Sequence, residues 1–131
     1  MAIQLGTTYR NALLDQFETT VSTSPRLWIF TGAQSANCAA ADPAGTLVNM
    51  LLPADWMTAA SNGSKIILGS WTTTATGAGT AASFRIKDSG STCHMQGSVG
   101  QGSGDMSLDN TNIASGQTVT VTAFSLTAPG V

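Results

Sequence analysis

Charge is what this sequence has least of. Only 9% of its 131 residues are Asp, Glu, Lys or Arg, against about 25% in an average soluble domain. The five basic residues are scattered along the chain: Arg10, Arg26, Lys65, Arg85 and Lys87. Affinity for nucleic acid depends on clustered Lys and Arg side chains that contact phosphates. The sequence therefore argues against DNA or RNA as a partner.

Long apolar segments are missing as well. No apolar run approaches the roughly 20 residues that a membrane-spanning helix needs. Residues 1–5 lack the basic start and the long apolar stretch of a signal peptide. We therefore expect no membrane partner, and we expect the chain to be made in the cytoplasm and to stay there.

Residue types that carry catalysis are scarce. His94 is the single histidine, and the seven carboxylates lie in separate turns or on a predicted helix. Asp105 and Asp109 resemble part of a calcium loop, but their spacing does not match the EF-hand pattern. The glycine-rich segment 97–104 lacks both the spacing and the Lys of a phosphate-binding loop. We therefore expect no enzyme activity, no bound metal and no cofactor.

Only two cysteines are present, Cys38 and Cys93. Neither has a second Cys or a His at the spacing of a zinc site. In a reducing cytoplasm we expect two free thiols that pack as small hydrophobic groups. The alternative is a disulfide that forms after release from the cell.

Short neutral side chains take the place of the missing charges, because Thr, Ser, Gly and Ala make up about half of the chain. Such a surface loses little side-chain entropy when a neighbour covers it. This composition suits a subunit that packs into an assembly. It also suits an extracellular adhesive module.

Apolar spacing predicts one helix over residues 7–20. Its apolar stripe consists of Tyr9, Leu13 and Phe17, which recur every four residues. We expect Arg10, Asp15 and Glu18 on the opposite, solvent-facing side. Pro25 marks the end of this segment.

The rest of the chain has the period of β-structure. Strands are predicted at 26–31, 46–52, 65–71, 83–87, 92–96, 106–108 and 117–126, with one or two helical turns at 54–60. Turns rich in Gly and Asn separate them, which predicts an antiparallel β-sandwich or jelly roll. We expect one domain over 1–131, with a helical arm followed by a sandwich over 26–127. The polar segment 32–45 is a long loop of the kind that often belongs to a function.

Two strands have an informative side-chain order. In 83–87, Phe84 and Ile86 are expected to face inward and Arg85 and Lys87 outward, with Cys93 on the inward face of the partner strand. In 117–126 the inward set of Val119, Val121 and Ala123 shifts by one residue at Phe124. Such a shift predicts a β-bulge. The alternative places Phe124 and Leu126 in an interface.

Large apolar side chains supply the candidate contacts with a partner. Strand 26–31 has such side chains on both of its faces, so both faces should be covered. We expect two or all three of the tryptophans to lie in the core; exposed tryptophans would instead form a platform for sugars. The candidate partner-contact residues are Trp28, Phe30, Ile67, Phe124 and Leu126.

Four segments resemble small structural proteins of tailed bacteriophages and prophages. They are GTTYRNALLDQ, LLPADWM, GTAASFRIKDSGSTCHMQGSV, and GDMSLDN with IASGQTVTVTAFSLT, and they run over most of the chain. In size and predicted topology the chain is also similar to capsid cement proteins, which are jelly-roll-like modules that clamp neighbouring capsomers. The resemblance implies a place in the virion, with the major capsid protein and further copies of this chain, as a dimer or trimer, as partners. It offers no catalytic residues.

The leading hypothesis is therefore a capsid cement or decoration protein. A tail, neck or fibre-base protein is the alternative within the virion. A sugar-binding adhesin is the alternative from another class, and an enzyme, which would have to use His94, is a further one.

Overall fold

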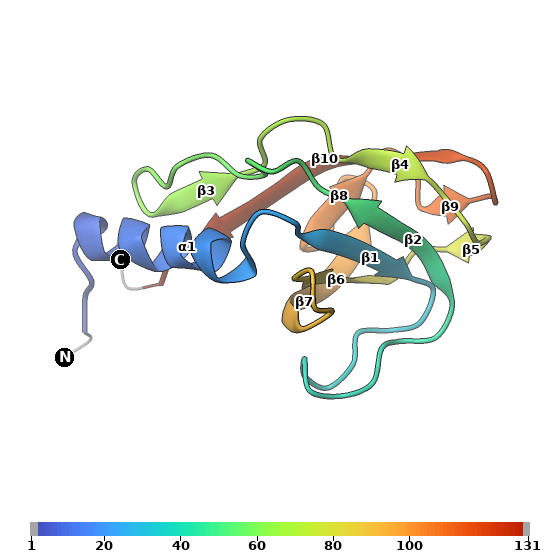
Figure 1. The fold of residues 1–131 in the computed structure, drawn as a ribbon, viewed down its shortest axis with the longest axis horizontal. Helices are drawn as coiled ribbons and strands as arrows, with labels where there is room; N and C mark the ends of the chain where they lie inside the picture. Colours follow the sequence, from blue (N-terminus) through green and yellow to red (C-terminus); the bar gives the residue numbers. More distant parts are fainter. Residues whose placement is uncertain (1–2, 130–131) are drawn as a thin grey trace.

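The computed structural model describes residues 3–129 as a mainly β protein with one helix (Figure 1). The elements are α1 (Thr7–Val21), β1 (Arg26–Phe30), β2 (Thr46–Leu51), β3 (Ser64–Ile66), β4 (Thr72–Thr74), β5 (Gly79–Thr80), β6 (Ser83–Lys87), β7 (Cys93–Gly100), β8 (Met106–Leu108), β9 (Asn112–Ile113) and β10 (Thr118–Thr127). The predicted β-rich class with a single N-terminal helix is confirmed.

One curled sheet contains most of the strands. Its order is β2-β1-β6-β7-β8-β10-β3, and β4 also pairs with β10. All of these pairs are antiparallel except β7 with β8. The backbone amides of Thr76 and Gly77 donate to the carbonyl of Leu47 in β2. The end of the sheet that carries β4 therefore curls back onto β2, while β5 and β9 form a separate short pair (Figure 1).

A row of aromatic rings runs through the core. The ring of Trp56 lies 5.5 Å from Phe17 and 6.0 Å from Trp71, and Trp71 lies 5.9 Å from Phe124. These centroid distances are typical of favourable aromatic pairs. Trp56 and Trp71 are fully buried, and the Trp71 indole N–H donates to the carbonyl of Trp56. The expectation that at least two tryptophans are core residues is confirmed.

The predicted bulge in the last strand is also confirmed. The register of β10 against β8 shifts between Val121 and Ala123. Thr122 and Ala123 are both exposed, and Phe124 returns to the core. The extra residue keeps the apolar side chains on one face. Ala123, which was expected to face inward, is the residue that the bulge turns outward.

The helix packs through a different face from the one predicted. Tyr9 and Leu13 are 57% and 41% exposed, whereas Arg10 and Leu14 are buried. The Arg10 guanidinium donates to the carbonyl of Ala128, from Nε at 3.2 Å and from Nη2 at 2.9 Å. A long-range polar contact of this kind is not visible in helical periodicity. The predicted stripe is therefore wrong apart from Phe17, which packs against the core.

The chain between residues 54 and 100 differs from the prediction in four places. β3 ends at Ile66, three residues before Gly69, which has a left-handed φ of 76°. β4 forms between the predicted strands 65–71 and 83–87, where no strand was predicted, and β7 continues to Gly100, beyond the predicted end at residue 96. The helical turns predicted at 54–60 are absent, because Met57 forms a β-bridge with Ile67.

Gly97 in β7 leaves no room for a side chain. A Cβ atom there would lie 2.7 Å from Cε1 of the buried Phe84 ring. We expect Gly97→Ala to lower the free energy of unfolding by about 2 kcal/mol, as overpacking in cores does. Urea unfolding measures this change. Gly90→Ala is the control, because its Cβ would meet only Asp88 Oδ1 at 3.4 Å; equal losses in the two variants would contradict the prediction.

Candidate functional site

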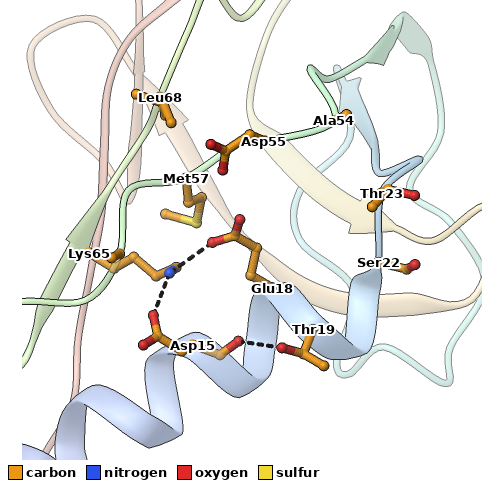
Figure 2. Close-up of a pocket in the computed structure, with 11 residues that line it drawn as sticks. Asp15, Glu18, Thr19, Ser22, Thr23, Ala54, Asp55, Met57, Lys65 and Leu68 are labelled. Carbon is orange, nitrogen blue, oxygen red and sulfur yellow. Dashed lines mark hydrogen bonds and ion pairs between the residues drawn. The ribbon is translucent and has the colours of Figure 1, made fainter.

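A hollow in the surface lies between the C-terminal half of α1 and the segments on either side of β3 (Figure 2). It is an open groove of about 570 Å³. Its lining is Asp15, Glu18, Thr19, Ser22, Thr23, Ala54, Asp55, Met57, Ala59, Lys65 and Leu68. Both apolar and charged groups therefore face the groove.

A buried lysine joins the two walls of this groove. Lys65 is 2% exposed, and its Nζ lies 2.7 Å from Asp15 Oδ1 and 2.8 Å from Glu18 Oε1. Burial alone would lower the pKa of Lys65, but the hydrogen bonds to the two carboxylates outweigh it and raise the pKa. The hydrogen bond from Lys65 lowers the pKa of Asp15, helped by the Ala60 amide at 3.0 Å. These contacts attach α1 to β3.

The charge of the groove is negative. Figure 2 shows Asp55 on the wall opposite α1, across from Glu18. With Asp15, the groove carries three carboxylates and one cation, Lys65, whose side chain is almost fully covered. Chemically, the groove is suited to contact with a neutral or basic surface. Among residues 3–129, no three His, Cys, Asp or Glu side chains come together as metal ligands.

A second polar cluster lies under the loop between β1 and β2. Arg85 and Lys87 were expected to face solvent, but they are 2% and 7% exposed. The loop 32–45 covers them, and its Asp42 accepts from Arg85 Nη1 at 2.8 Å and from Lys87 Nζ at 2.7 Å. Burial alone would raise the pKa of Asp42, but the hydrogen bonds from Lys87 and Arg85 lower it below its usual value. The Lys87 ammonium also lies 5.0 Å from the ring centre of Trp28, a cation–π distance.

The two cysteines form a disulfide between this loop and β7, so the expectation of two free thiols is wrong in this structure. Cys93 was also expected to face inward. The β6–β7 register shifts between Ile86 and Lys87, which places Cys93 opposite Lys87. Cys93 therefore shares the outer face with Lys87, where the loop brings Cys38 to it.

The single histidine, His94, lies in β7 and contacts the turn between β6 and β7. His94 Nε2 lies 2.9 Å from Asp88 Oδ2, while Asp88 Oδ1 accepts from the amides of Gly90 and Thr92. The hydrogen bond with His94 is the first cause of the lowered pKa of Asp88. These bonds stabilise the β6–β7 turn.

The five candidate contact residues divide by burial. Phe30 and Phe124 are 0% and 5% exposed, so they are core residues and offer no contact surface in this conformation. Trp28, Ile67 and Leu126 are half-buried. The structure does not bring the five together at one place, and a contact role for the three half-buried residues stays a prediction.

Other apolar side chains are more accessible. The large exposed ones are Ile3, Tyr9, Leu13, Leu51, Ile66 and Leu68. Tyr9 and Leu13 form the outer face of α1, and Leu68 lines the groove. Periodicity marked Tyr9 and Leu13 as apolar, but a pattern within one helix does not tell a core face from an uncovered one.

Comparison with protein-family models, curated proteins and solved structures finds no match to this chain. None of the described helices is both long and apolar enough to cross a membrane.

The paired carboxylates make stability depend on pH. The folded-state pKa values of Asp15, Asp42 and Asp88 lie below the ordinary 3.8. These three carboxylates therefore add to the free energy of unfolding above about pH 4, and this addition is lost as the pH falls through the folded-state values. The pKa of Lys65 is raised above its ordinary value of 10.5, so Lys65 adds to the free energy of unfolding below about pH 10.5. This addition is lost as the pH rises through the folded-state pKa of Lys65. We expect a plateau in the free energy of unfolding between about pH 5 and 10.

Urea unfolding at pH 7, 4 and 2.5 measures the acid limb of this dependence. The urea midpoint should fall between pH 4 and 2.5. Asp55→Asn should keep the full fall in the urea midpoint, because Asp55 takes part in none of the ion pairs among residues 3–129. In Asp42→Asn the urea midpoint should fall less between pH 4 and 2.5 than it does in the wild type. An unchanged wild-type midpoint at pH 2.5 would contradict the prediction.

Proposed function

We propose that this protein is a structural component of a tailed-phage virion, and specifically a capsid cement or decoration protein on the outer surface of the head. The observation that carries the proposal is the nature of its surface. Four of the five basic side chains, Arg10, Lys65, Arg85 and Lys87, are buried, and the fifth, Arg26, is half-buried. What remains accessible is mostly short neutral side chains with a few carboxylates and uncovered apolar groups. Such a surface loses little free energy when a protein neighbour displaces its water.

The proposed mechanism is mechanical. Many copies bind across the seams between major capsid proteins, and pressure from the packaged DNA must break these contacts to open the shell. Tyr9 and Leu13 on the outer face of α1 are the proposed anchors, with Trp28, Ile67 and Leu126 as further candidates. The scarcity of accessible cations on this chain favours a partner surface that supplies Lys or Arg. Copies associate as dimers or trimers, and assembly takes place in the host cytoplasm.

A jelly-roll-like sandwich belongs to the same proposal. The curled sheet, whose two ends meet at Leu47 and Thr76, supports it, because two facing layers also result when a sheet folds back on itself. The similarity to cement modules in size, and the resemblance of the four sequence segments to small structural proteins of tailed phages, also support it. Fold class alone does not determine function, so the decisive measurement is one of location and copy number.

Quantitative mass spectrometry of purified particles tests the proposal. It compares copies of this protein with copies of the major capsid protein. Hundreds of copies per particle, in a simple ratio to the capsid protein, are the expected result. A few to a few dozen copies would assign the protein to the tail, neck or fibre base instead. Its absence from particles would refute a virion role of either kind.

A further inference from the structure

The disulfide is not the only link between the loop 32–45 and the sheet. Cys38 and Cys93 are 55 residues apart in the sequence, and their Cα atoms lie 5.4 Å apart. Around them, a set of polar contacts joins the same two parts of the chain. We call these residues the polar latch: Asn37, Ala40, Asp42, Arg85, Lys87 and Gln96.

Arg85 holds the loop on both sides of Cys38. Its Nη2 donates to the carbonyl of Asn37 at 3.0 Å, and its Nη1 donates to the carbonyl of Ala40 at 3.0 Å. The side chain of Asn37 also accepts from the amides of Ala39 and Ala40, which closes a local turn around Cys38. The position of Cys38 is therefore determined by contacts that do not involve its sulfur.

The other end of the latch belongs to the strand that carries Cys93. Gln96 in β7 accepts from Arg85 Nε at 3.2 Å and from Nη2 at 3.1 Å. Its Nε2 donates to the carbonyl of Ser35 in the loop at 2.7 Å. Asp42 completes the latch through its two ion pairs. A fork of guanidinium donors in such a geometry is rigid and well desolvated, so these contacts are strong without covalent help.

We propose that the polar latch forms in the dithiol chain and holds Cys38 against Cys93, so that the disulfide closes directly in the folded protein when it meets an oxidant. The oxidant is a low-molecular-weight disulfide. One cysteine thiolate attacks it, forms a mixed disulfide and releases one small thiol. The second cysteine thiolate then attacks the mixed disulfide and releases the other small thiol. The protein loses two electrons and two protons, and the reagent becomes two thiols.

This inference goes beyond the proposed function and does not depend on it. A chain that folds among reducing thiols would carry a preformed latch and free cysteines. On transfer to an oxidising medium it would gain a covalent lock without refolding. Linkage between the two is reciprocal. The factor by which the formed latch raises the equilibrium constant for disulfide formation equals the factor by which the disulfide raises the equilibrium constant for latch formation.

Oxidation of the reduced protein in glutathione buffers tests the proposal. The measured quantity is the effective concentration of the two thiols, from the ratio of dithiol to disulfide protein after alkylation. Asp42→Asn removes both ion pairs of the latch but leaves the cysteines, and it should lower this concentration at least tenfold. Asp55→Asn makes the same charge change outside the latch and should stay within twofold of the wild type. Equal values for Asp42→Asn and the wild type would overturn the proposal.

Hydrogen exchange gives a second measurement that needs no variant of the latch. In the reduced wild type, the amides of Ala39 and Ala40 should keep protection within about tenfold of the oxidised protein. Loss of that protection while the core around Trp56 and Trp71 stays protected would show that the disulfide alone holds the loop, which would overturn the proposal. This result decides the question if reduced Asp42→Asn does not fold.

Discussion

Reduction of the Cys38–Cys93 disulfide is expected to lower the free energy of unfolding by about 4 kcal/mol. The bond closes a loop with a sequence separation of 55 residues. In the chain-entropy model a loop of this length restricts the unfolded chain by about 4 kcal/mol, and measured losses are commonly about 2–5 kcal/mol. For a domain of this size, such a loss corresponds to a fall in Tm on the order of 15 °C. The folded state should survive, because the polar latch and the core remain.

Thermal and urea unfolding with and without a phosphine reductant measure this loss. The double variant Cys38→Ser/Cys93→Ser is the matched control, because it should resemble the reduced wild type in both buffers. Alkylation and mass measurement must show two free thiols in the reduced sample. A Tm that does not change in such a sample would contradict the prediction and would mean that the unfolded chain is already restricted in this region.

Period-two patterning was sufficient to predict much of the sheet. Strands β1, β2, β6 and β10 lie where alternation placed them, within about one residue. The phase shift at Phe124 even located a bulge. These features are local, because alternation and its interruptions are properties of a few consecutive residues. The order of the strands and the curl of the sheet involve long-range pairing, which alternation does not contain.

Charged residues were the main source of error. The sequence pattern predicts solvent-facing side chains for Arg10, Arg85 and Lys87 and makes no prediction for Lys65, yet all four are buried. Each is buried because a distant segment supplies acceptors: Ala128, α1 or the loop 32–45. Burial of a charge requires such partners, and nothing in a linear pattern identifies a partner 40 or more residues away. The groove beside α1 was missed for the same reason.

The cysteines show how an assumption about compartment affects a structural prediction. Cys38 and Cys93 carry no spacing signal, so the expectation of free thiols depends on the assumption of a reducing cytoplasm. The structure brings them together through the latch, whose acceptors are mostly backbone carbonyls of Asn37 and Ala40. Backbone acceptors are available at every residue and leave no trace in the sequence. The sequence pattern therefore does not reveal the pairing of Cys38 with Cys93.

Removing the charge of Lys65 is expected to lower the free energy of unfolding much less than removing the charges of its partners, Asp15 and Glu18. The side chain of Lys65 is 1% exposed, whereas those of Asp15 and Glu18 are 50% and 22% exposed. If Lys65 is replaced by Met, the two carboxylates still reach water. If both carboxylates are neutralised, the ammonium remains buried without a compensating charge, or it must lose its proton. The second change should therefore be much more costly than the first.

We expect Asp15→Asn/Glu18→Gln to lower the free energy of unfolding by about 3 kcal/mol at pH 7, and Lys65→Met by about 1 kcal/mol or less. Denaturant unfolding at several pH values separates this cause from lost packing. In the double variant the folded-state pKa of Lys65 should lie below its unfolded value, so the unfolded chain binds more protons and stability should rise from pH 7 toward pH 10. The wild type should show no such rise, because its Lys65 pKa is raised. Equal losses in the two variants, or a double variant without the rise, would mean that the ammonium is hydrated through the groove and that its burial is not what attaches α1 to β3.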